Sequence, residues 1–205
     1  MKIIATKTDK DIAKEYANKF ISSKKSLKNF GNKSVLRSFD RQYNDAYLGR
    51  LGEILFSNML QKYGYKLFFD EEIRVGSNVG DGCKDIVGFK IDNSMFQTNA
   101  KIDIKSTNGN WLLVETHRFD ADAYVLLTIK NDCAEYRGYA LEEDFFGFQR
   151  PKYEYKSGDK LRNAFDTSKF LNVTLDAPHQ FGLPSSELRV GGFVDYLQKN
   201  SIEIA

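Results

Sequence analysis

The sequence predicts an α/β (α+β) fold, with a mixed central sheet flanked by helices. Helical spacing of apolar residues dominates the first 64 residues, strict alternation takes over to about residue 141, and helical spacing returns near the end. An order of helices, strands and helix is typical of a sheet covered by helices. With 205 residues, 41% of them hydrophobic, the chain has the size of one domain with a sizeable core.

Two helices are predicted before the strands. Thr8 is positioned to cap a helix that runs to about residue 25, because apolar residues follow it at helical spacing. A polar connector comes next, and a second helix is predicted from residue 44 or 45 to Gly64, a residue type that favours a left-handed helix stop. Residues 1–43 then form a basic helical region ahead of a core at 44–147 and a C-terminal lobe at 148–205.

Six segments alternate apolar and polar residues and are predicted as strands. They are residues 65–73, 85–91, 101–106, 111–116, 123–129 and 135–141. Residues 141–146 suggest a short helix, and residues 149–166 show little periodicity and suggest a long loop or lobe. The end of the chain, residues 186–200, is predicted as a capped helix that either supplies a dimer face or closes the core.

Composition narrows the class of protein. Two isolated cysteines and two isolated histidines provide neither a zinc pattern nor a disulfide framework. No apolar run reaches the ~20 residues of a membrane-spanning helix, and the N-terminus lacks a secretory apolar region, so a cytoplasmic protein is expected. Residues 1–50 hold 12 Lys or Arg against 5 Asp or Glu, whereas the remainder holds 18 against 23. This basic region either meets a phosphate-bearing partner or is a solvated helix surface.

The stretch AKIDIKST, residues 100–107, carries the strongest functional signal. Period two places Asp103 and Lys105 on the same face of a strand whose opposite face is apolar. Asp85 opens the preceding predicted strand, and an antiparallel pairing of these two strands would bring Asp85 next to Asp103. Two converging carboxylates repel unless a proton or a cation joins them, and oxygen ligands of this kind suit Mg²⁺.

A third carboxylate lies on the second predicted helix. Glu53 falls just beyond the edge of the apolar arc of that helix, from where its side chain can reach over the rim of the sheet. Gly49 and Gly52 beside it permit close packing against a strand or a nucleic-acid backbone.

Together, Glu53, Asp85 and the run Asp103–Ile104–Lys105 resemble the PD-(D/E)XK nuclease superfamily, the fold of most type II restriction endonucleases. The resemblance covers residues 45–146, including the segments FDADAYVLLTI and YRGYALEEDFF. One departure is Lys84, which stands where the family often has proline. Asp81, which lies between glycines, is the rival for the position of Asp85.

The resemblance implies Mg²⁺-dependent hydrolysis of phosphodiester bonds. Asp85, Asp103 and the Ile104 carbonyl would hold the metal, and Glu53 would hold a second metal or bind the first through water. Lys105 would orient the attacking water and neutralise charge on the phosphate. Both Asp103 and Lys105 are expected to face solvent, so that Asp103→Ala or Lys105→Ala should abolish cleavage and leave folding largely intact.

Several residues are candidates for contacts with double-stranded DNA. Those expected to contact its phosphates or lie near the cut are Lys24, Lys25, Lys28, Lys33, Arg37, Arg41, Asn108 and Arg118. Residues 149–165 mix aromatic, basic and amide side chains, and form either a recognition loop or an ordinary surface insertion. Trp111 either touches DNA or belongs to the core, and His117 accompanies Arg118 in a turn.

The short chain, without helicase or methylase motifs, resembles an orthodox type II restriction endonuclease, and such enzymes are usually homodimers. A phage or repair nuclease of the same fold, a catalytically inactive DNA-binding module, and an interaction protein without a nucleic-acid role remain alternatives. No GxxxxGK[ST] or GxGxxG motif is present, so no nucleotide cofactor is expected.

Overall fold

The computed structural model describes residues 1–24, 38–70, 84–148, 150–175 and 179–204. Its helices are α1 (Lys7–Lys24), α2 (Phe39–Gln61) and α3 (Phe193–Lys199), with the 3-10 turns η1 (Thr116–Arg118), η2 (Glu142–Phe145) and η3 (Ser185–Glu187). The first strands are β1 (Lys2–Ile4), β2 (Tyr65–Phe69), β3 (Ile86–Ile91), β4 (Ser94–Thr98), β5 (Ile102–Thr107), β6 (Trp111–Glu115), β7 (Ala123–Lys130) and β8 (Cys133–Leu141). The others are β9 (Phe146–Gly147), β10 (Arg150–Pro151), β11 (Glu154–Tyr155), β12 (Lys160–Asn163), β13 (Asp166–Thr174), β14 (Gln180–Pro184) and β15 (Ser201–Ile204).

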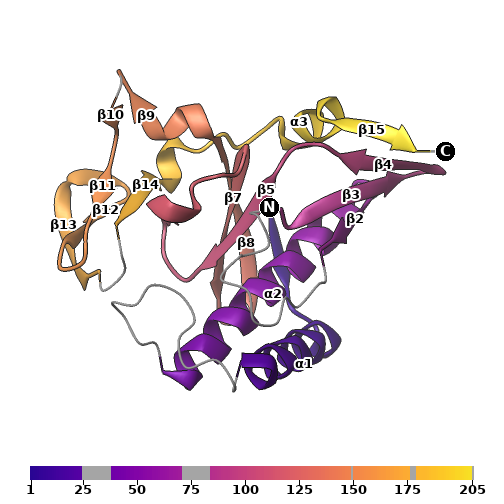
Figure 1. The fold of residues 1–205 in the computed structure, drawn as a ribbon, viewed down its shortest axis with the longest axis horizontal. Coiled ribbons are helices and arrows are strands. Elements are labelled where there is room, and N and C mark those ends of the chain that lie inside the picture. Colours follow the sequence, from indigo (N-terminus) through magenta and orange to yellow (C-terminus); the bar gives the residue numbers. More distant parts are fainter. Residues whose placement is uncertain (25–37, 71–83, 149, 176–178, 205) are drawn as a thin grey trace.

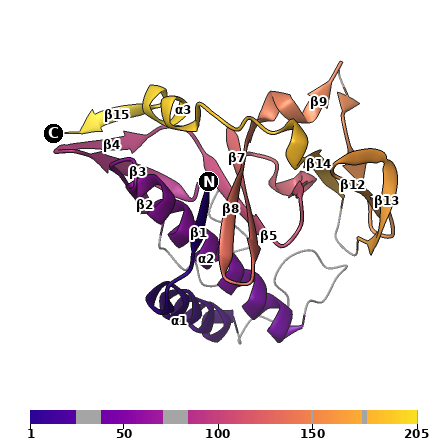
Figure 2. The same cartoon turned by 180° about the vertical axis from the view of Figure 1, so that it is seen from behind.

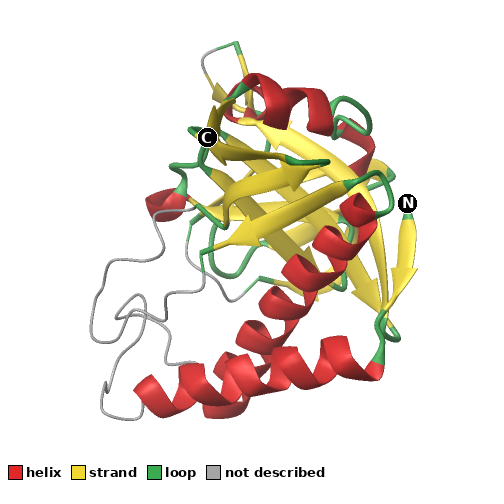
Figure 3. Ribbon diagram, turned by 90° about the vertical axis from the view of Figure 1, so that its right-hand side faces the viewer, coloured by secondary structure: helices red, strands yellow, loops and turns green. Residues whose placement is uncertain are grey.

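The central sheet has the order β1-β8-β7-β5, with β5 and β7 parallel and the other pairs antiparallel. Helix α2 lies across one face of this sheet and α1 packs on α2 (Figures 1 and 3). The mixed sheet with covering helices confirms the predicted α+β class. On the end of the sheet opposite β5, the N-terminal strand β1 pairs with β8 (Figure 2).

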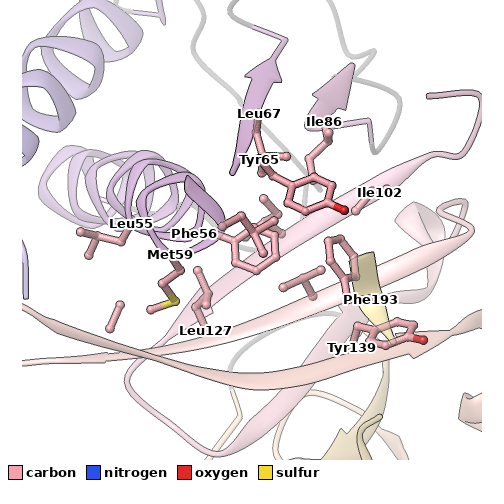
Figure 4. Packing of buried hydrophobic residues seen from close by; sticks show 14 of the residues in the cluster. Leu55, Phe56, Met59, Tyr65, Leu67, Ile86, Ile102, Leu127, Tyr139 and Phe193 are labelled. Carbon is pink, nitrogen blue, oxygen red and sulfur yellow. The ribbon is translucent and has the colours of Figure 1, made fainter. Parts of the chain in front are cut away.

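The main core fills the space between α2 and the sheet. Leu55, Phe56 and Met59 of α2 lie in one buried cluster with Ile102 of β5 and Leu127 of β7 (Figure 4). All five side chains are almost completely buried. Burial of a side chain of this size contributes about 1.5–3 kcal/mol, so this face of α2, rather than its intrinsic helix propensity, holds the helix on the sheet.

A second sheet, in the order β15-β4-β3-β2, extends from the central one. The prediction that residues 85–91 and 101–106 form an antiparallel pair is wrong, because β3 pairs with β4 and β5 pairs with β7. Asp92 has a φ of 51°, and the residues on either side of the Asp92–Asn93 turn, Ile91 and Ser94, are register partners. A two-residue loop with positive φ makes a tight hairpin, so the residues between the two predicted strands contain a further strand, β4.

A third group of strands forms a lobe on the other side of β7. Here β6 pairs with β14, β14 pairs with β11, and β12 and β13 form a hairpin. Of the two interpretations of residues 149–166, a long loop or a lobe, the described part fits the lobe, because it contains the paired strands β10, β11 and β12. Gln149 lies outside the described residues. Trp111 is 3% exposed, and its indole Nε1 donates a hydrogen bond to the Arg162 carbonyl at 2.6 Å, which makes it a core residue.

The helix boundaries differ from those predicted. Thr6, not Thr8, caps α1: its Oγ1 accepts from the Asp9 backbone, while Asp9 Oδ2 accepts from the Thr6 backbone. Helix α2 begins at Phe39, several residues earlier than expected, because the Ser38 side chain accepts a hydrogen bond from the Arg41 backbone.

The C-terminal helix is shorter than predicted. The segment begins with η3, and α3 covers only Phe193–Lys199, because Gly192 has a φ of 80° and interrupts the helix. Leu188, Phe193 and Leu197 are all buried in the cores. This part of the chain therefore closes the core. None of the helices in the part of the chain that the structure describes has the length and apolar character to cross a bilayer.

Candidate active site

Strand β5 is the edge strand of the central sheet and carries the DxK run. Its neighbours in register are on β7, where Asp103 lies opposite Tyr124 and Lys105 opposite Leu126. The alternate residues of β5, Ile102 and Ile104, point into the core beneath α2. The strand thus has one apolar face under the helix and one face with a carboxylate and an ammonium, as the sequence predicted.

Asp103 and Lys105 form a close ion pair. The Lys105 Nζ and Asp103 Oδ2 atoms are 2.5 Å apart. The Asp103 side chain is 7% exposed and the Lys105 side chain is 32% exposed. The expectation that both face solvent is therefore wrong for Asp103, which the surrounding strands bury. Although Lys105 balances its charge, the buried Asp103 Oδ2 atom accepts no hydrogen bond of good geometry in the described structure.

Asp85 reaches the same strand from the start of β3. Its backbone N–H donates to the Ile102 carbonyl at 2.8 Å, and its carbonyl accepts from the Asp70 backbone at 2.9 Å. Its side-chain Oδ2 accepts from the backbone N–H of Ile104 at 2.6 Å. The expected proximity of Asp85 to the DxK run is thus present, although it arises from a side-chain contact at the edge of β5 rather than from a ladder of paired strands.

The backbone N–H of Ile104 points toward the Asp85 carboxylate. In a strand, the N–H and C=O of one residue point to the same side, and these sides alternate along the chain. The Ile102 carbonyl and the Ile104 N–H both bond to Asp85. The Ile104 carbonyl consequently faces this edge as well, where the resemblance placed a metal ligand.

Glu53 lies on α2, close to where this helix touches β5. A Cβ atom added to Gly52 would lie 1.7 Å from the Ser106 Oγ atom, so the backbone of α2 contacts β5 directly at this point. The Glu53 carboxylate is 2.7 Å from Arg50 Nη1, and the two side chains are 18% and 11% exposed. The Arg50 guanidinium in turn stacks over the Phe69 ring at 5.9 Å.

Arg50, the partner of Glu53, lies between two aromatic rings, Phe69 of β2 and, at 5.4 Å, Tyr16 of α1. Phe69 immediately precedes Asp70, whose backbone bonds to Asp85. Glu53 is nevertheless held by Arg50, and no three His, Cys, Asp or Glu side chains within the described ranges form a group that could hold a metal ion. The participation of Glu53 in a metal site stays a prediction. Asp81, the rival to Asp85, lies outside the described residues.

The residues on β5 and its edge fit a magnesium ion by their chemistry. Mg²⁺ binds one or two protein carboxylates and takes its other ligands from water and phosphate. Asp85 and Asp103 provide the two carboxylates, and the Ile104 carbonyl adds a neutral oxygen. The donor set is all oxygen, which favours Mg²⁺ over metals that prefer nitrogen or sulfur ligands.

The predicted DNA-contact residues are only partly described. Lys25, Lys28, Lys33 and Arg37 lie outside the described residues. Lys24 ends α1, and Arg41 is exposed in the first turn of α2. Asn108 is exposed in the turn after β5, and the half-exposed Arg118 lies in η1, with its Nε 3.6 Å from Glu115 Oε2. His117 lies beside it and approaches the same carboxylate at 3.4 Å.

Sequence reasoning missed a polar contact chain at the end of β5. Thr128 Oγ1 donates to the Gly109 carbonyl at 2.8 Å and accepts from Arg137 Nε at 3.2 Å. A glycine at position 138, inside a segment that otherwise alternates, was the available signal, because glycine within a strand often marks a bulge.

Comparisons were made with protein-family models, with curated proteins and with solved structures. None of them gives a significant match to the chain.

Proposed function

We propose that the protein is a Mg²⁺-dependent nuclease that hydrolyses phosphodiester bonds in double-stranded DNA. The observation that carries this proposal is the hydrogen bond from the Ile104 N–H to the Asp85 carboxylate, because it sets Asp85 beside the strand that bears Asp103 and Lys105. Two carboxylates and an ammonium at one sheet edge are the groups that metal-assisted phosphoryl chemistry requires.

Each residue has a distinct part in the proposed reaction. Asp85, Asp103 and the Ile104 carbonyl would hold the magnesium, which when bound acts as a Lewis acid and lowers the pKa of water. The third-exposed Lys105 can reach a phosphate while its ion pair with Asp103 fixes its position. Its ammonium would orient the attacking water and offset the charge that develops on the phosphoryl oxygens.

More narrowly, we propose a type II restriction endonuclease of the PD-(D/E)XK superfamily, active as a homodimer in the cytoplasm. The support is the order of the elements: a helix with Glu53, then Asp85 at the start of a strand, then the DxK edge strand. A palindromic site with two scissile strands matches the two-fold axis of a homodimer.

Cleavage assays test this proposal. Purified protein is incubated at low salt with several phage and plasmid DNAs, with Mg²⁺ or with EDTA, alongside Asp103→Asn. Discrete bands that need Mg²⁺ and disappear in the variant are expected, and the fragment ends would identify the site. A Mg²⁺-dependent smear would keep the nuclease but replace the restriction enzyme with a phage or repair enzyme. Salt-sensitive binding without cleavage of any DNA would replace catalysis with a binding module.

A further inference from the structure

Strand β8 contains a bulge that displaces one charged residue from the ladder. Leu126 pairs with Gly138, and the next residue of β7, Leu127, pairs with Tyr136. Arg137 is therefore the extra residue, without a partner of its own across the ladder. Bulges of this kind are common next to active sites, where they redirect a side chain.

The bulge is specified by the sequence. Gly138 has a φ of 137°, a conformation that other residues rarely adopt. A Cβ atom at this position would also lie 2.8 Å from the Arg189 carbonyl oxygen and 2.8 Å from the Leu188 Cβ atom. Because the surrounding chain allows only glycine here, the direction of the Arg137 side chain is built into the fold.

Arg137 reaches the face of the sheet that carries Lys105. Register partners share a face, and the pairs Lys105–Leu126 and Thr107–Thr128 follow one another along β5 and β7. Arg137 Nε donates to Thr128 Oγ1, so the guanidinium lies beside the end of this row. Thr128 in turn bonds to the Gly109 carbonyl in the turn after β5.

We propose that Arg137 binds a backbone phosphate of the DNA next to the phosphate that Lys105 contacts. This inference rests on the proposed function. Lys105 and Thr107 are two residues apart on β5, a separation of ~7 Å along the strand. Thr128 is the register partner of Thr107 and accepts from Arg137, so Arg137 adds a second cation to the face that carries Lys105, farther along the sheet. Two cations on one face can contact neighbouring phosphates of the same DNA strand. The exposed Asn108 lies in the same turn as Gly109 and flanks the path.

The other contacts of Arg137 leave donors for a ligand. A guanidinium has five N–H donors, and Nε uses one of them on Thr128. Nη2 lies 3.1 Å from Glu135 Oε2, and the side chain is 25% exposed. Glu135 also lies 3.6 Å from Lys2 Nζ. An arginine oriented by a threonine and a carboxylate, with a side chain that stays partly exposed, is suited to bidentate phosphate recognition.

The test compares three variants in DNA binding. Affinity for a labelled duplex of about 30 base pairs is measured by anisotropy in EDTA, from about 50 to 300 mM salt. Arg137→Gln is expected to weaken binding about tenfold and to reduce the slope of log K against log salt by about 0.9, the loss of one phosphate contact. Lys2→Gln removes an equal charge, and Glu135→Gln removes the ion-pair partner. Both are expected to keep the wild-type slope.

The outcomes separate this inference from the proposed function. If the wild-type protein cleaves DNA with Mg²⁺ but Arg137→Gln binds with unchanged affinity and slope, the phosphate contact is refuted and the nuclease stands. An equal slope change in Glu135→Gln would show that Arg137 has only a structural role, and would also refute the proposed phosphate contact. A wild-type protein that neither binds nor cleaves DNA would refute both. Thermal unfolding of each variant shows whether a change in binding follows from lost stability.

Discussion

The carboxylate of Asp85 accepts a hydrogen bond from the backbone N–H of Ile104 at 2.6 Å, although Asp85 directly precedes β3 of the second sheet and Ile104 lies in the central sheet. The backbone N–H of Asp85 donates to the Ile102 carbonyl, and the Asp85 carbonyl accepts from the backbone N–H of Asp70. These contacts fix both the backbone and the side chain of Asp85 against the edge of β5. A carboxylate held in this way needs little rearrangement to share a ligand with Asp103.

The burial of Asp103 changes how the proposed site must be tested. Lys105→Ala would leave a nearly buried carboxylate without its cation, at a cost of about 1–3 kcal/mol of stability. Asp103→Asn and Lys105→Gln keep the shape of the side chains more closely. Each is expected to reduce the rate of DNA cleavage by at least about 10²-fold, since a group that stabilises the transition state is lost. Cleavage time courses and urea unfolding measure the two effects, and wild-type cleavage by either variant would contradict the assignment.

The role of Glu53 can be distinguished from that of its ion-pair partner Arg50 by measuring how cleavage depends on the Mg²⁺ concentration. If Glu53 supports a magnesium ligand, Glu53→Gln should raise the Mg²⁺ concentration for half-maximal cleavage by about 10–100-fold. Arg50→Gln removes the same ion pair from the other side and serves as the control. Equal losses of stability in both variants, with an unchanged Mg²⁺ dependence, would restrict Glu53 to a structural part in α2.

The contact between α2 and β5 predicts opposite effects for two glycines of the same helix. Gly52→Ala would place a methyl group 1.7 Å from Ser106 Oγ and 2.9 Å from its Cβ, so destabilisation by about 1–3 kcal/mol is expected. A Cβ at Gly49 meets nothing within 4 Å. Gly49→Ala should therefore stabilise the helix by up to about 1 kcal/mol. Urea unfolding compares them, and a neutral Gly52→Ala would disprove the close approach.

Three tyrosines, one buried and two partly buried, predict a loss of stability at alkaline pH. Burial raises the pKa of Tyr155 and of Tyr196 to about 12, and it also raises the pKa of Tyr136. In the unfolded chain these phenols ionise near pH ~10, so the unfolded state loses its protons first. The stabilisation is complete below about pH 10 and decreases as the pH rises toward 12. Unfolding free energies that stay constant between about pH 9 and 12 would contradict this burial.

The strands nearest the site were predictable because burial gives them a clear pattern. Segments 101–106 and 123–129 alternate or are continuously apolar, and they correspond to β5 and β7. The pairing of these strands was not predictable, since β5 lies next to β7 in parallel while β3 turns back onto β4. No local signal distinguishes these arrangements, because register and partner are decided by packing across the core.

The lobe was harder to predict for a different reason. Strand β13 is exposed along most of its length, so its sequence carries no apolar alternation. The proximity of Asp85 to Asp103 was expected, but through a ladder of paired strands rather than through a side-chain hydrogen bond. The bulge at Arg137 depends on Leu188 and Arg189, which approach Gly138 from a segment some 50 residues away in the sequence.

The position of Asp85 also bears on the self-association of the protein. An edge strand offers unpaired N–H and C=O groups to any other strand, including that of another chain. At β5 two of these groups, the Ile102 carbonyl and the Ile104 N–H, are already bonded to Asp85. The carboxylate proposed for metal binding therefore also shields the sheet from intermolecular β-pairing. Replacement of Asp85 by a residue without an acceptor would leave the Ile104 N–H unpaired. Such a variant is expected to aggregate more readily, in addition to losing a proposed metal ligand.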